Sequence, residues 1–486
     1  MQNKMRFKKV AFIISKFTGE NQDNRGLLLG VGYISQYLLD NDIPNKVIDL
    51  RLGYSVQEVK QILAEYKPDL VAVLCFTNGF GETYSVVKAI KSNEYKTLIG
   101  GYHVSTIKSK ILEETDADFA IKVEGEDAML ELCKGVPFEK VLNLIYRKCN
   151  GKIIENPTRL PITDLDKFNF PRYESFEFKK YDHLMPLCSS RGCPFLCTFC
   201  TAATTAGRQF RVRSPENVVA EMKMWYDKGY KSFCFVDDNF TLMKNRVMEI
   251  CNLIEKNKLA GIKIRCSGIR ADRVDREVLT KMRKVGFDQI GIGVEVGNDK
   301  MLKIIKKGET LAQIEKAIKE IVRLKYDLQL YFVIGNQYET TQDIEDSFKL
   351  ALKYPVSDVH FYNPLPFPGS ELYDWVLKNG YFIEDFNKYI NDHCHFSVNP
   401  VFATPELSAK ERTRLLKKSK KVEKIVLRRY IARKMNPTFK IFATPLSFVI
   451  MLEPIRWAIN TFFKHPFGKW TIKTFMKFFK VDVHYL

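Results

Sequence analysis

Short apolar, β-branched runs recur along this 486-residue chain, and each is followed by a segment with helical spacing of its apolar residues. The first series occupies residues 8–148 and contains the runs VAFIIS, KVIDL, DLVAVLCF, KTLIGG and DFAIKV. Continuous apolar strands that alternate with amphipathic helices are typical of a parallel sheet covered on both faces. We therefore expect a doubly wound, Rossmann-like α/β domain over residues 1–150.

A second, different series begins at residue 184, with the runs LMPLCSS, KSFCFVD, IKIRCSG, DQIGIGVE, LQLYFVIG and DVHFYNP. Six strand–helix units predict a partial (β/α)6 barrel of the TIM type over residues 184–395, with its site at the carboxyl ends of the strands. Prolines interrupt any regular pattern between the two series, so residues 151–183 are predicted to be a linker. Residues 396–486 are predicted to form a basic helical region.

Three cysteines, Cys193, Cys197 and Cys200, follow the first barrel strand with the spacing C-x3-C-x2-C. Three thiolates can hold three irons of a [4Fe–4S] cluster and leave the fourth iron open to another ligand. Zinc and three unrelated buried thiols are the alternatives. A closed zinc site needs a fourth ligand from a second, similarly spaced pair, and no such pair lies near. The spacing therefore favours an iron–sulfur cluster.

The cysteine loop, with Phe199 as the aromatic residue before the third cysteine, resembles the signature of the radical S-adenosylmethionine (SAM) enzymes. The resemblance implies that SAM binds the open iron and that one electron cleaves it to a 5′-deoxyadenosyl radical. It also implies that four residues contact SAM: Phe199 beside the adenine, and Asp237, Arg270 and Glu295 at the ends of the second, third and fourth barrel strands.

Each polar residue in this set has a structural alternative. Asp238, next to Asp237, can be the N-cap of the following helix. Arg270 can form an ion pair with Asp272 or Glu295 at the rim of the barrel. Glu295 ends an apolar, glycine-rich strand, where an ionised carboxylate needs a partner.

The first domain resembles the cobalamin (B12)-binding domain that precedes the barrel in one large subgroup of radical SAM enzymes. The match lies in residues 24–38, 98–105 and 123–132, although the D-x-H-x-x-G signature of other cobalamin proteins is missing. The resemblance implies cobalamin contacts from Gly26, Thr77, Asn78, Gly100, Gly101, His103, Glu124, Gly125 and Glu126. The alternatives are a domain that keeps the fold without the cofactor, and a His103 that is exposed or bonded to the backbone.

The net charge of +19 is concentrated near the C-terminus, where the residues from 410 onward contain nineteen Lys or Arg and four Asp or Glu. The apolar run 441–452 is too short to span a bilayer. Aromatic residues interleaved with lysines over residues 469–480 favour a helix that lies in an anionic membrane interface. A helical cap on the barrel and a nucleic-acid patch are the alternatives, and clustered aromatic residues make nucleic acid the weakest.

Together these features predict a cobalamin-dependent radical SAM enzyme in the cytoplasm, peripheral on the inner face of the membrane. The predicted reaction is methylation of an unactivated carbon in an apolar, lipid-like small molecule, with electrons from a flavodoxin or ferredoxin. Tyr362 and Phe367 are candidate walls of the substrate pocket. The alternatives are a radical cyclase or carbon-skeleton rearrangement with the same cofactors, and a non-catalytic cobalamin or SAM sensor at the membrane.

Overall fold

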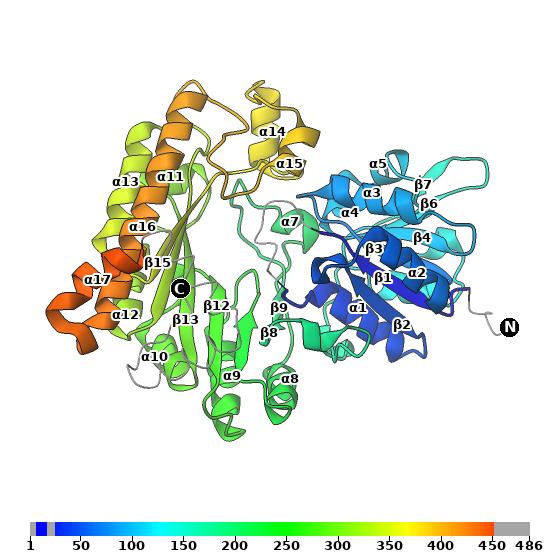
Figure 1. The fold of residues 1–486 in the computed structure, drawn as a ribbon, viewed down its shortest axis with the longest axis horizontal. Helices are drawn as coiled ribbons and strands as arrows, with labels where there is room; N and C mark the ends of the chain where they lie inside the picture. The colour runs from blue at the N-terminus through cyan, green and yellow to red at the C-terminus, as the bar shows by residue number, and fades with distance from the viewer. Residues whose placement is uncertain (1–5, 17–24, 452–486) are drawn as a thin grey trace.

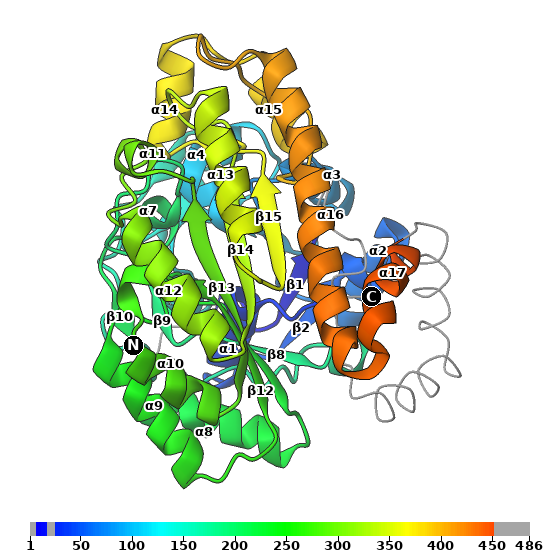
Figure 2. The same cartoon turned by 90° about the vertical axis from the view of Figure 1, so that its left-hand side faces the viewer.

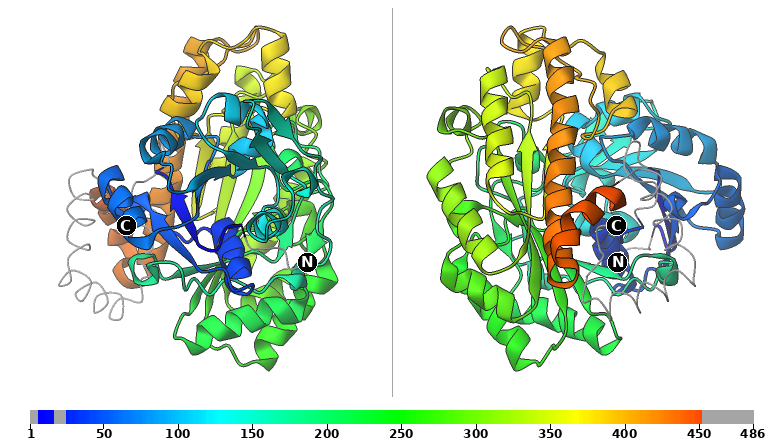
Figure 3. Two further views of the ribbon diagram at one scale, coloured as in Figure 1. Left: turned by 90° about the vertical axis from the view of Figure 1, so that its right-hand side faces the viewer. Right: turned by 60° about the vertical axis from the view of Figure 1, so that its left-hand side comes forward.

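The computed structural model describes residues 6–16 and 25–451, which form two lobes (Figure 1). The predicted interfacial helix and residue 24, the first residue of the match to the cobalamin-binding domain, lie outside the described residues. The first lobe is the N-terminal domain, and the second is built around a separate sheet. The N-terminal domain lies in front of the inner face of that second sheet (Figure 3).

The first domain is a seven-stranded sheet in the order β2-β1-β3-β4-β5-β6-β7. The strands β1 to β5 are parallel, and β6 and β7 are added antiparallel at one edge. The strands are β1 (Val10–Ile14), β2 (Asn45–Asp49), β3 (Leu70–Leu74), β4 (Lys96–Gly100), β5 (Phe119–Ile121), β6 (Leu144–Arg147) and β7 (Ile153–Glu155). The predicted Rossmann-like domain is confirmed, and its sheet continues to Glu155, inside the predicted linker.

Helices cover both faces of this sheet, as the continuous apolar strands require. One face is packed by α1 (Leu29–Leu39) and α6 (Glu126–Cys133). The other is packed by α2 (Val56–Tyr66), α3 (Phe80–Ile90), α4 (Tyr102–Ile107) and α5 (Lys110–Glu113). The chain turns in opposite directions from the neighbouring strands β1 and β3, which makes their carboxyl ends the switch point where such sheets bind ligands.

The second domain contains six parallel strands in the order β15-β14-β13-β12-β11-β8, which do not close into a ring. The strands are β8 (Leu184–Leu187), β11 (Ser232–Phe235), β12 (Lys263–Ile269), β13 (Phe287–Glu295), β14 (Asp327–Val333) and β15 (Asp358–Tyr362). Its helices are α8 (Pro215–Asp227), α9 (Lys244–Lys256), α10 (Arg276–Lys284), α11 (Asp299–Ile304), α12 (Leu311–Arg323) and α13 (Thr341–Lys353), on the outer face (Figure 2). The predicted partial barrel is confirmed.

The segment after β15 returns to the first domain. It contains α14 (Glu371–Lys378) and α15 (Phe386–Asp392), and Tyr389 and Ile390 of α15 are buried in the core on the α3 side of the first sheet. The backbone N–H of Gly81 donates to the side chain of Asn391, with 2.8 Å between N and Oδ1. The two lobes therefore share a packed core in addition to polar contacts.

The basic region begins with α16 (Ala409–Phe439), a long helix beside α13 and the edge strand β15 (Figures 2 and 3). Leu415, Leu416 and Val422 are buried in the core of the barrel, whereas Lys417 and Lys421 are exposed. Oε1 of Glu423 accepts the backbone N–H of Phe361 at 2.9 Å, which satisfies a donor on the edge strand. The described part of the basic region is thus a helical cap on the barrel, which the sequence offered as an alternative to a membrane helix.

The short helix α17 (Ala443–Ile450) packs against α16. No helix between residues 6 and 451, with the gap at 17–24, combines the length and apolar character needed to cross a bilayer.

Candidate active site

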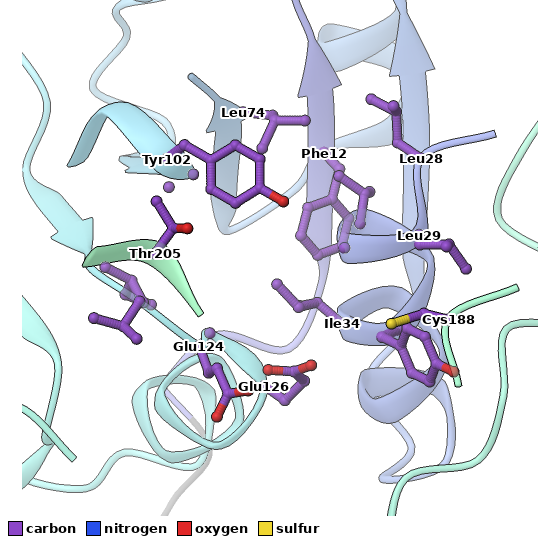
Figure 4. A pocket seen from close by; sticks show the side chains of 18 of the residues that line it. Phe12, Leu28, Leu29, Ile34, Leu74, Tyr102, Glu124, Glu126, Cys188 and Thr205 are labelled. Carbon is purple, nitrogen blue, oxygen red and sulfur yellow. The ribbon is translucent and has the colours of Figure 1, made fainter. Parts of the chain in front are cut away.

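A cavity of about 510 Å³ opens at the carboxyl ends of the strands of the first domain and faces the barrel (Figure 4). Phe12, Ile34 and Leu74 form part of its apolar wall, and Tyr102 points into it. The barrel contributes Asp238 and other residues to the same lining. Both domains therefore border this one space.

Two glycines at the end of β4 line the cavity, one where there is open space and one where the backbone packs closely. A Cβ added at Gly100 would meet no atom closer than 3.9 Å, so the absence of a side chain there leaves space. Gly101 has φ +117°, and a Cβ there would lie 2.4 Å from the carbonyl oxygen of Cys75. Apolar walls and bare backbone at sheet ends fit the flat face of a corrin macrocycle.

Five of the predicted cobalamin residues line this cavity: Gly100, Gly101, Glu124, Gly125 and Glu126. His103 does not. Its ring stacks on Phe80 with 4.5 Å between centroids, and its Nε2 lies 3.2 Å from the hydroxyl of Tyr84. Burial, with a smaller contribution from Lys110, lowers the pKa of His103 to about 4. The side chain lies on the α3 side of the sheet, away from this cavity, so a corrin contact from His103 stays a prediction that its position disfavours.

After β3, too, the residue that lines the cavity is the neighbour of the predicted one. Phe76 lines the cavity, whereas Thr77 is buried and, like Asn78, is not part of the lining. The carbonyl oxygen of Gly26 accepts a hydrogen bond from Nη2 of Arg51 at 3.0 Å, and a corrin contact from Gly26 stays a prediction.

Glu124 and Glu126 are engaged in ion pairs across the two domains. Oε1 of Glu124 lies 3.0 Å from Nη1 of Arg191 and 2.7 Å from Nη1 of Arg211, and Oε1 of Glu126 lies 2.8 Å from Nη2 of Arg191. Burial raises the pKa of Glu124, but the two arginines outweigh it, so the net pKa is lowered. These carboxylates hold the cysteine-loop side of the barrel against the first domain.

The cysteine loop is fixed at the carboxyl edge of the barrel. Gly192 has φ +85°, a Cβ there would lie 2.4 Å from the carbonyl oxygen of Gln209, and its N–H donates to Oδ2 of Asp238 at 3.2 Å. The N–H of Thr198 donates to the carbonyl oxygen of Ile305, and the carbonyl oxygen of Thr198 accepts the N–H of Leu372. Segments from several parts of the chain thus hold the segment that carries the cysteines.

The three cysteines have free thiols, with Cys193 and Cys197 half-buried and Cys200 exposed. Within the described residues, no three His, Cys, Asp or Glu side chains gather as they would around a single metal ion. A [4Fe–4S] cluster has a different requirement, because each cysteine binds a different iron. A soft, three-thiolate donor set at the open edge of the barrel fits such a cluster with one iron left for SAM.

The end of β11 places Asp238, rather than Asp237, toward the shared cavity. Asp237 is buried, and its Oδ1 accepts hydrogen bonds from the hydroxyls of Ser189 at 2.7 Å and Ser190 at 2.5 Å. Burial raises the pKa of both aspartates. Asp238 is not the N-cap of α9, because that position belongs to Met243. SAM contact by Asp237 remains a prediction that its existing bonds disfavour.

Arg270 and Glu295 belong to a buried network of charges beside the cysteine loop. Nε of Arg270 lies 3.0 Å from Asp272, as the structural alternative predicted, and its guanidinium lies 3.5 Å from the centroid of the Phe195 ring in the cysteine loop. Glu295 pairs instead with Lys307, at 3.0 Å between Oε1 and Nζ.

Lys307 lies at the centre of this network and was not found from the sequence. Its side chain is 7% exposed, and its Nζ also lies 3.7 Å from Glu309. Burial lowers the pKa of Lys307, but Glu295 and Glu309 outweigh it, so the net pKa is raised. Lys307 follows α11 in a KKGET turn, which gives no sequence signal that separates it from the exposed Lys306.

Glu295 has φ +67°, in the left-handed region that few residues other than glycine adopt. A Cβ added at Gly293 would lie 2.3 Å from Oε1 of Glu295, so the glycine makes room for the carboxylate. Phe199 is half-buried and packs against the cores of both domains. Its predicted place beside the SAM adenine stays untested.

Comparison with known proteins identifies both domains. A model of the B12 binding domain matches residues 22–133, and a model of the radical SAM superfamily matches residues 187–351. The chain belongs to the cobalamin-binding radical SAM enzymes. Its cofactors are a [4Fe–4S] cluster, SAM and cobalamin.

Several curated and solved proteins are similar over most of the chain. An uncharacterized methyltransferase of Pyrococcus horikoshii is 28% identical over 80% of this chain and 86% of its own length. The anaerobic magnesium-protoporphyrin IX monomethyl ester cyclase of Rubrivivax gelatinosus is 26% identical over 69% of this chain and 63% of its own. The solved cobalamin-dependent SAM radical enzyme OxsB has a TM-score of 0.68 at 16% identity, over 98% of this chain and 75% of its own, which supports the fold.

Proposed function

We propose that this enzyme transfers a methyl group from SAM to an unactivated carbon. The observation that carries the proposal is the cavity shared by the two domains, because it borders the carboxyl ends of the first sheet and Asp238 beside the cysteine loop. A corrin in that cavity would lie next to the edge where SAM binds. The similarity to a methyltransferase over most of both chains supports the same reaction.

Cobalamin supplies a carrier for the methyl group, and the cluster supplies one electron to SAM. One SAM gives up its methyl group and leaves as S-adenosylhomocysteine. A second SAM, with one electron, would be cleaved to methionine and 5′-deoxyadenosine, which would carry away the hydrogen atom of the substrate C–H bond, and the carried methyl group would take that place on the carbon. Each methyl transfer would then use two molecules of SAM and two electrons, both from a flavodoxin- or ferredoxin-type reductant.

The protein's own residues position these groups. The ion pairs of Glu124 and Glu126 with Arg191 fix the distance between the corrin cavity and the cysteine loop. Arg270 and Lys307 are already paired with carboxylates. Their charges give the carboxyl edge of the barrel, where SAM would bind, a fixed electrostatic field. Positioning of this kind, rather than acid–base chemistry, is what a radical transfer needs from its protein.

The test uses anaerobically purified protein loaded with iron, sulfide and hydroxocobalamin. SAM with an isotopic label in its methyl group is added with a reductant, and the protein-bound corrin is isolated. Methyl transfer predicts label on the corrin and release of S-adenosylhomocysteine. Absence of label on a corrin that stays bound would contradict the proposal.

The similarity to the Rubrivivax cyclase favours one second candidate, a radical cyclisation with the same cofactors. A cyclase would release 5′-deoxyadenosine with a substrate, but its product would contain no labelled methyl group. The same labelled SAM therefore separates the two reactions.

The exposed side chains around α17 support the predicted contact with an anionic membrane surface. Phe442 is 67% exposed, Phe448 54% and Val449 44%, and the guanidinium of Arg428 lies 3.8 Å from the centroid of the Phe448 ring. Apolar residues beside cations suit a lipid interface. Flotation with phosphatidylglycerol vesicles should be lost in a Phe442→Ser, Phe448→Ser variant and kept in Leu377→Ser, an equally exposed apolar residue on α14. Equal flotation of both variants would count against a lipid contact through α17.

A further inference from the structure

The inner face of the barrel sheet carries three aromatic side chains on its last two strands. Leu330 and Phe332 of β14 are buried in the core of the barrel, so Tyr331 between them points to the opposite, inner face. His360 is the register partner of Tyr331 on β15, and Tyr362 is two residues further along the same face. We call Tyr331, His360 and Tyr362 the inner aromatic wall.

The rings of this wall are close and near-parallel. The centroids of Tyr331 and His360 are 5.7 Å apart with 19° between the ring planes, and those of His360 and Tyr362 are 6.2 Å apart with 24°. Tyr331 and Tyr362 are 6.0 Å apart with 35° between their planes. Three half-buried rings thus form one continuous surface on the inner face.

A glycine on the neighbouring strand sets the position of Tyr331. A Cβ added at Gly291 of β13 would lie 2.6 Å from Cε2 of Tyr331 and 3.1 Å from Cα of Ser267. Any larger residue at position 291 would therefore push the ring away from the sheet. Because the backbone supports one side of the ring, its other side is directed into the barrel.

The wall carries polar atoms at its edges. The hydroxyl of Tyr331 donates to Oε1 of Gln329 at 2.8 Å and lies 3.4 Å from the hydroxyl of Ser267. Nε2 of His360 lies 3.3 Å from Oδ2 of Asp358. A saturated hydrocarbon placed here would remove these groups from water without offering hydrogen bonds in return, which costs free energy. A planar group with polar atoms at its rim would lose less.

We propose that the inner aromatic wall binds a planar, unsaturated, hydrogen-bonding group of the substrate. This proposal rests on the proposed function in one respect: the function is what makes the bound ligand the substrate. The wall lies beside the SAM edge, because Gly293 and Glu295 continue along β13 from Gly291. Stacking on such rings is favourable and orients a planar ligand. This does not agree with the apolar, lipid-like substrate predicted from the sequence, because the inner face is aromatic and polar.

The test compares two bicyclic alcohols with the same carbon skeleton, planar 2-naphthol and saturated decahydro-2-naphthol. Their binding to the holoenzyme is measured by equilibrium dialysis without reductant. We expect retention of 2-naphthol and little displacement by the saturated alcohol. Tyr331→Leu and His360→Leu should each raise the dissociation constant of 2-naphthol about tenfold. Tyr331→Phe keeps the ring and should bind 2-naphthol within about threefold of the wild type, because the stacking surface is preserved.

The matched control is Tyr226→Leu, because Tyr226 lies on α8 at the outer face of the barrel. This variant should bind 2-naphthol like the wild type. Equal binding by the Tyr331→Leu and His360→Leu variants and the wild type would overturn the proposal, as would equal affinity for the saturated alcohol. Displacement of 2-naphthol by S-adenosylhomocysteine would assign the wall to the adenine of SAM and would also overturn it. Because no turnover is needed, failure of methyl transfer leaves a positive binding result intact.

Discussion

The cofactor sites of the two domains lie at the carboxyl ends of parallel strands, but they are built in opposite ways. The site in the first domain is a cavity with apolar walls, where the absence of a side chain at Gly100 leaves space. The edge of the barrel is filled with charged groups, and Lys307 is enclosed by Glu295 and Glu309. One site provides space for a large ligand, whereas the other provides a fixed electrostatic field for a small charged one.

The largest expected effect is the loss of one cofactor from one site while the other site keeps its own. Gly100→Leu adds a side chain where the cavity has space, so the purified protein should lose cobalamin and keep its cluster. Cys197→Ala should lose the cluster and SAM cleavage and keep cobalamin. Iron, sulfide and corrin are measured on each reconstituted variant. Loss of both cofactors in either variant would show that the two sites depend on each other.

The next effect tests the charged edge. Lys307→Met leaves Glu295 without its cation and leaves Glu309 with only Arg270, at 3.8 Å, so it should lower the free energy of unfolding by about 3–5 kcal/mol. Lys306→Met is the matched control, because Lys306 pairs with Glu371 at the surface and should cost less than about 1 kcal/mol. Urea unfolding of the two reconstituted variants gives the comparison, and equal losses would contradict a special role of the buried network.

A smaller effect is expected at the ion pairs between the domains. Glu124→Gln removes the charge that faces Arg191 and the buried Arg211, and it should cost about 2 kcal/mol. Glu131→Gln, which faces the more exposed Arg159, should change the stability by less than about 1 kcal/mol. Hydrogen exchange in residues 187–213 should rise only in Glu124→Gln. Unchanged exchange there would mean that the packed core, and not these pairs, holds the domains together.

The last effect concerns the pH dependence of stability and belongs to the barrel alone. Burial raises the pKa of Glu339 to about 7, although the N–H groups of Gly335 and Asn336 donate to its carboxylate. The folded protein therefore keeps a proton that the unfolded chain loses above about 4.5, so stability should fall as pH rises from about 4.5 to 7, with a slope of at most about 1.4 kcal/mol per pH unit.

Glu339→Gln should flatten this part of the pH profile, measured as the unfolding midpoint between pH 5 and 8. Asp343→Asn is the control, because the hydrogen bonds of Asp343 to Lys300 and Thr340 outweigh its burial and lower its pKa to about 2. The stability that Asp343 contributes is present above about 3.8 and is lost only as pH falls toward 2. Because its charge is the smallest of the influences on the pKa of Glu339, this variant should keep most of the slope between pH 5 and 8. A slope unchanged in Glu339→Gln would assign it to other groups.

The sequence predicted where the sites lie better than which side chains face them. Apolar strands and amphipathic helices fix a parallel sheet, and strand ends then locate both sites. At three strand ends, however, the residue that lines the cavity is a neighbour of the polar residue named from the sequence: Phe76 beside Thr77, Tyr102 beside His103, and Asp238 beside Asp237, which was predicted to contact SAM. In all three cases a polar residue was favoured over its neighbour, and the favoured polar side chain is buried in the protein instead.

The reason is geometric and energetic. All three pairs lie just beyond the last residue of a strand, where successive side chains still point in different directions, so an error of one residue changes the assignment. Asp237 and His103 find partners inside the protein, which residue type alone does not reveal. The position of Lys307 depends on contacts with Glu295, twelve residues away, and on its burial, which no local pattern encodes. Glycine signals at Gly100 and Gly101 were more informative, because backbone conformation and space are local properties.

The bond between Glu423 and Phe361 has a consequence for the synthesis of this protein. The two residues are 62 positions apart, so the last strand of the barrel leaves the ribosome well before the helix that covers its edge. At a translation rate of roughly 5–20 residues per second, the edge strand is synthesised about 3 to 12 seconds before Glu423. During that interval the nascent chain presents an unpaired strand on which another chain can pair. Slow translation between residues 361 and 423 should therefore favour aggregation and dependence on chaperones.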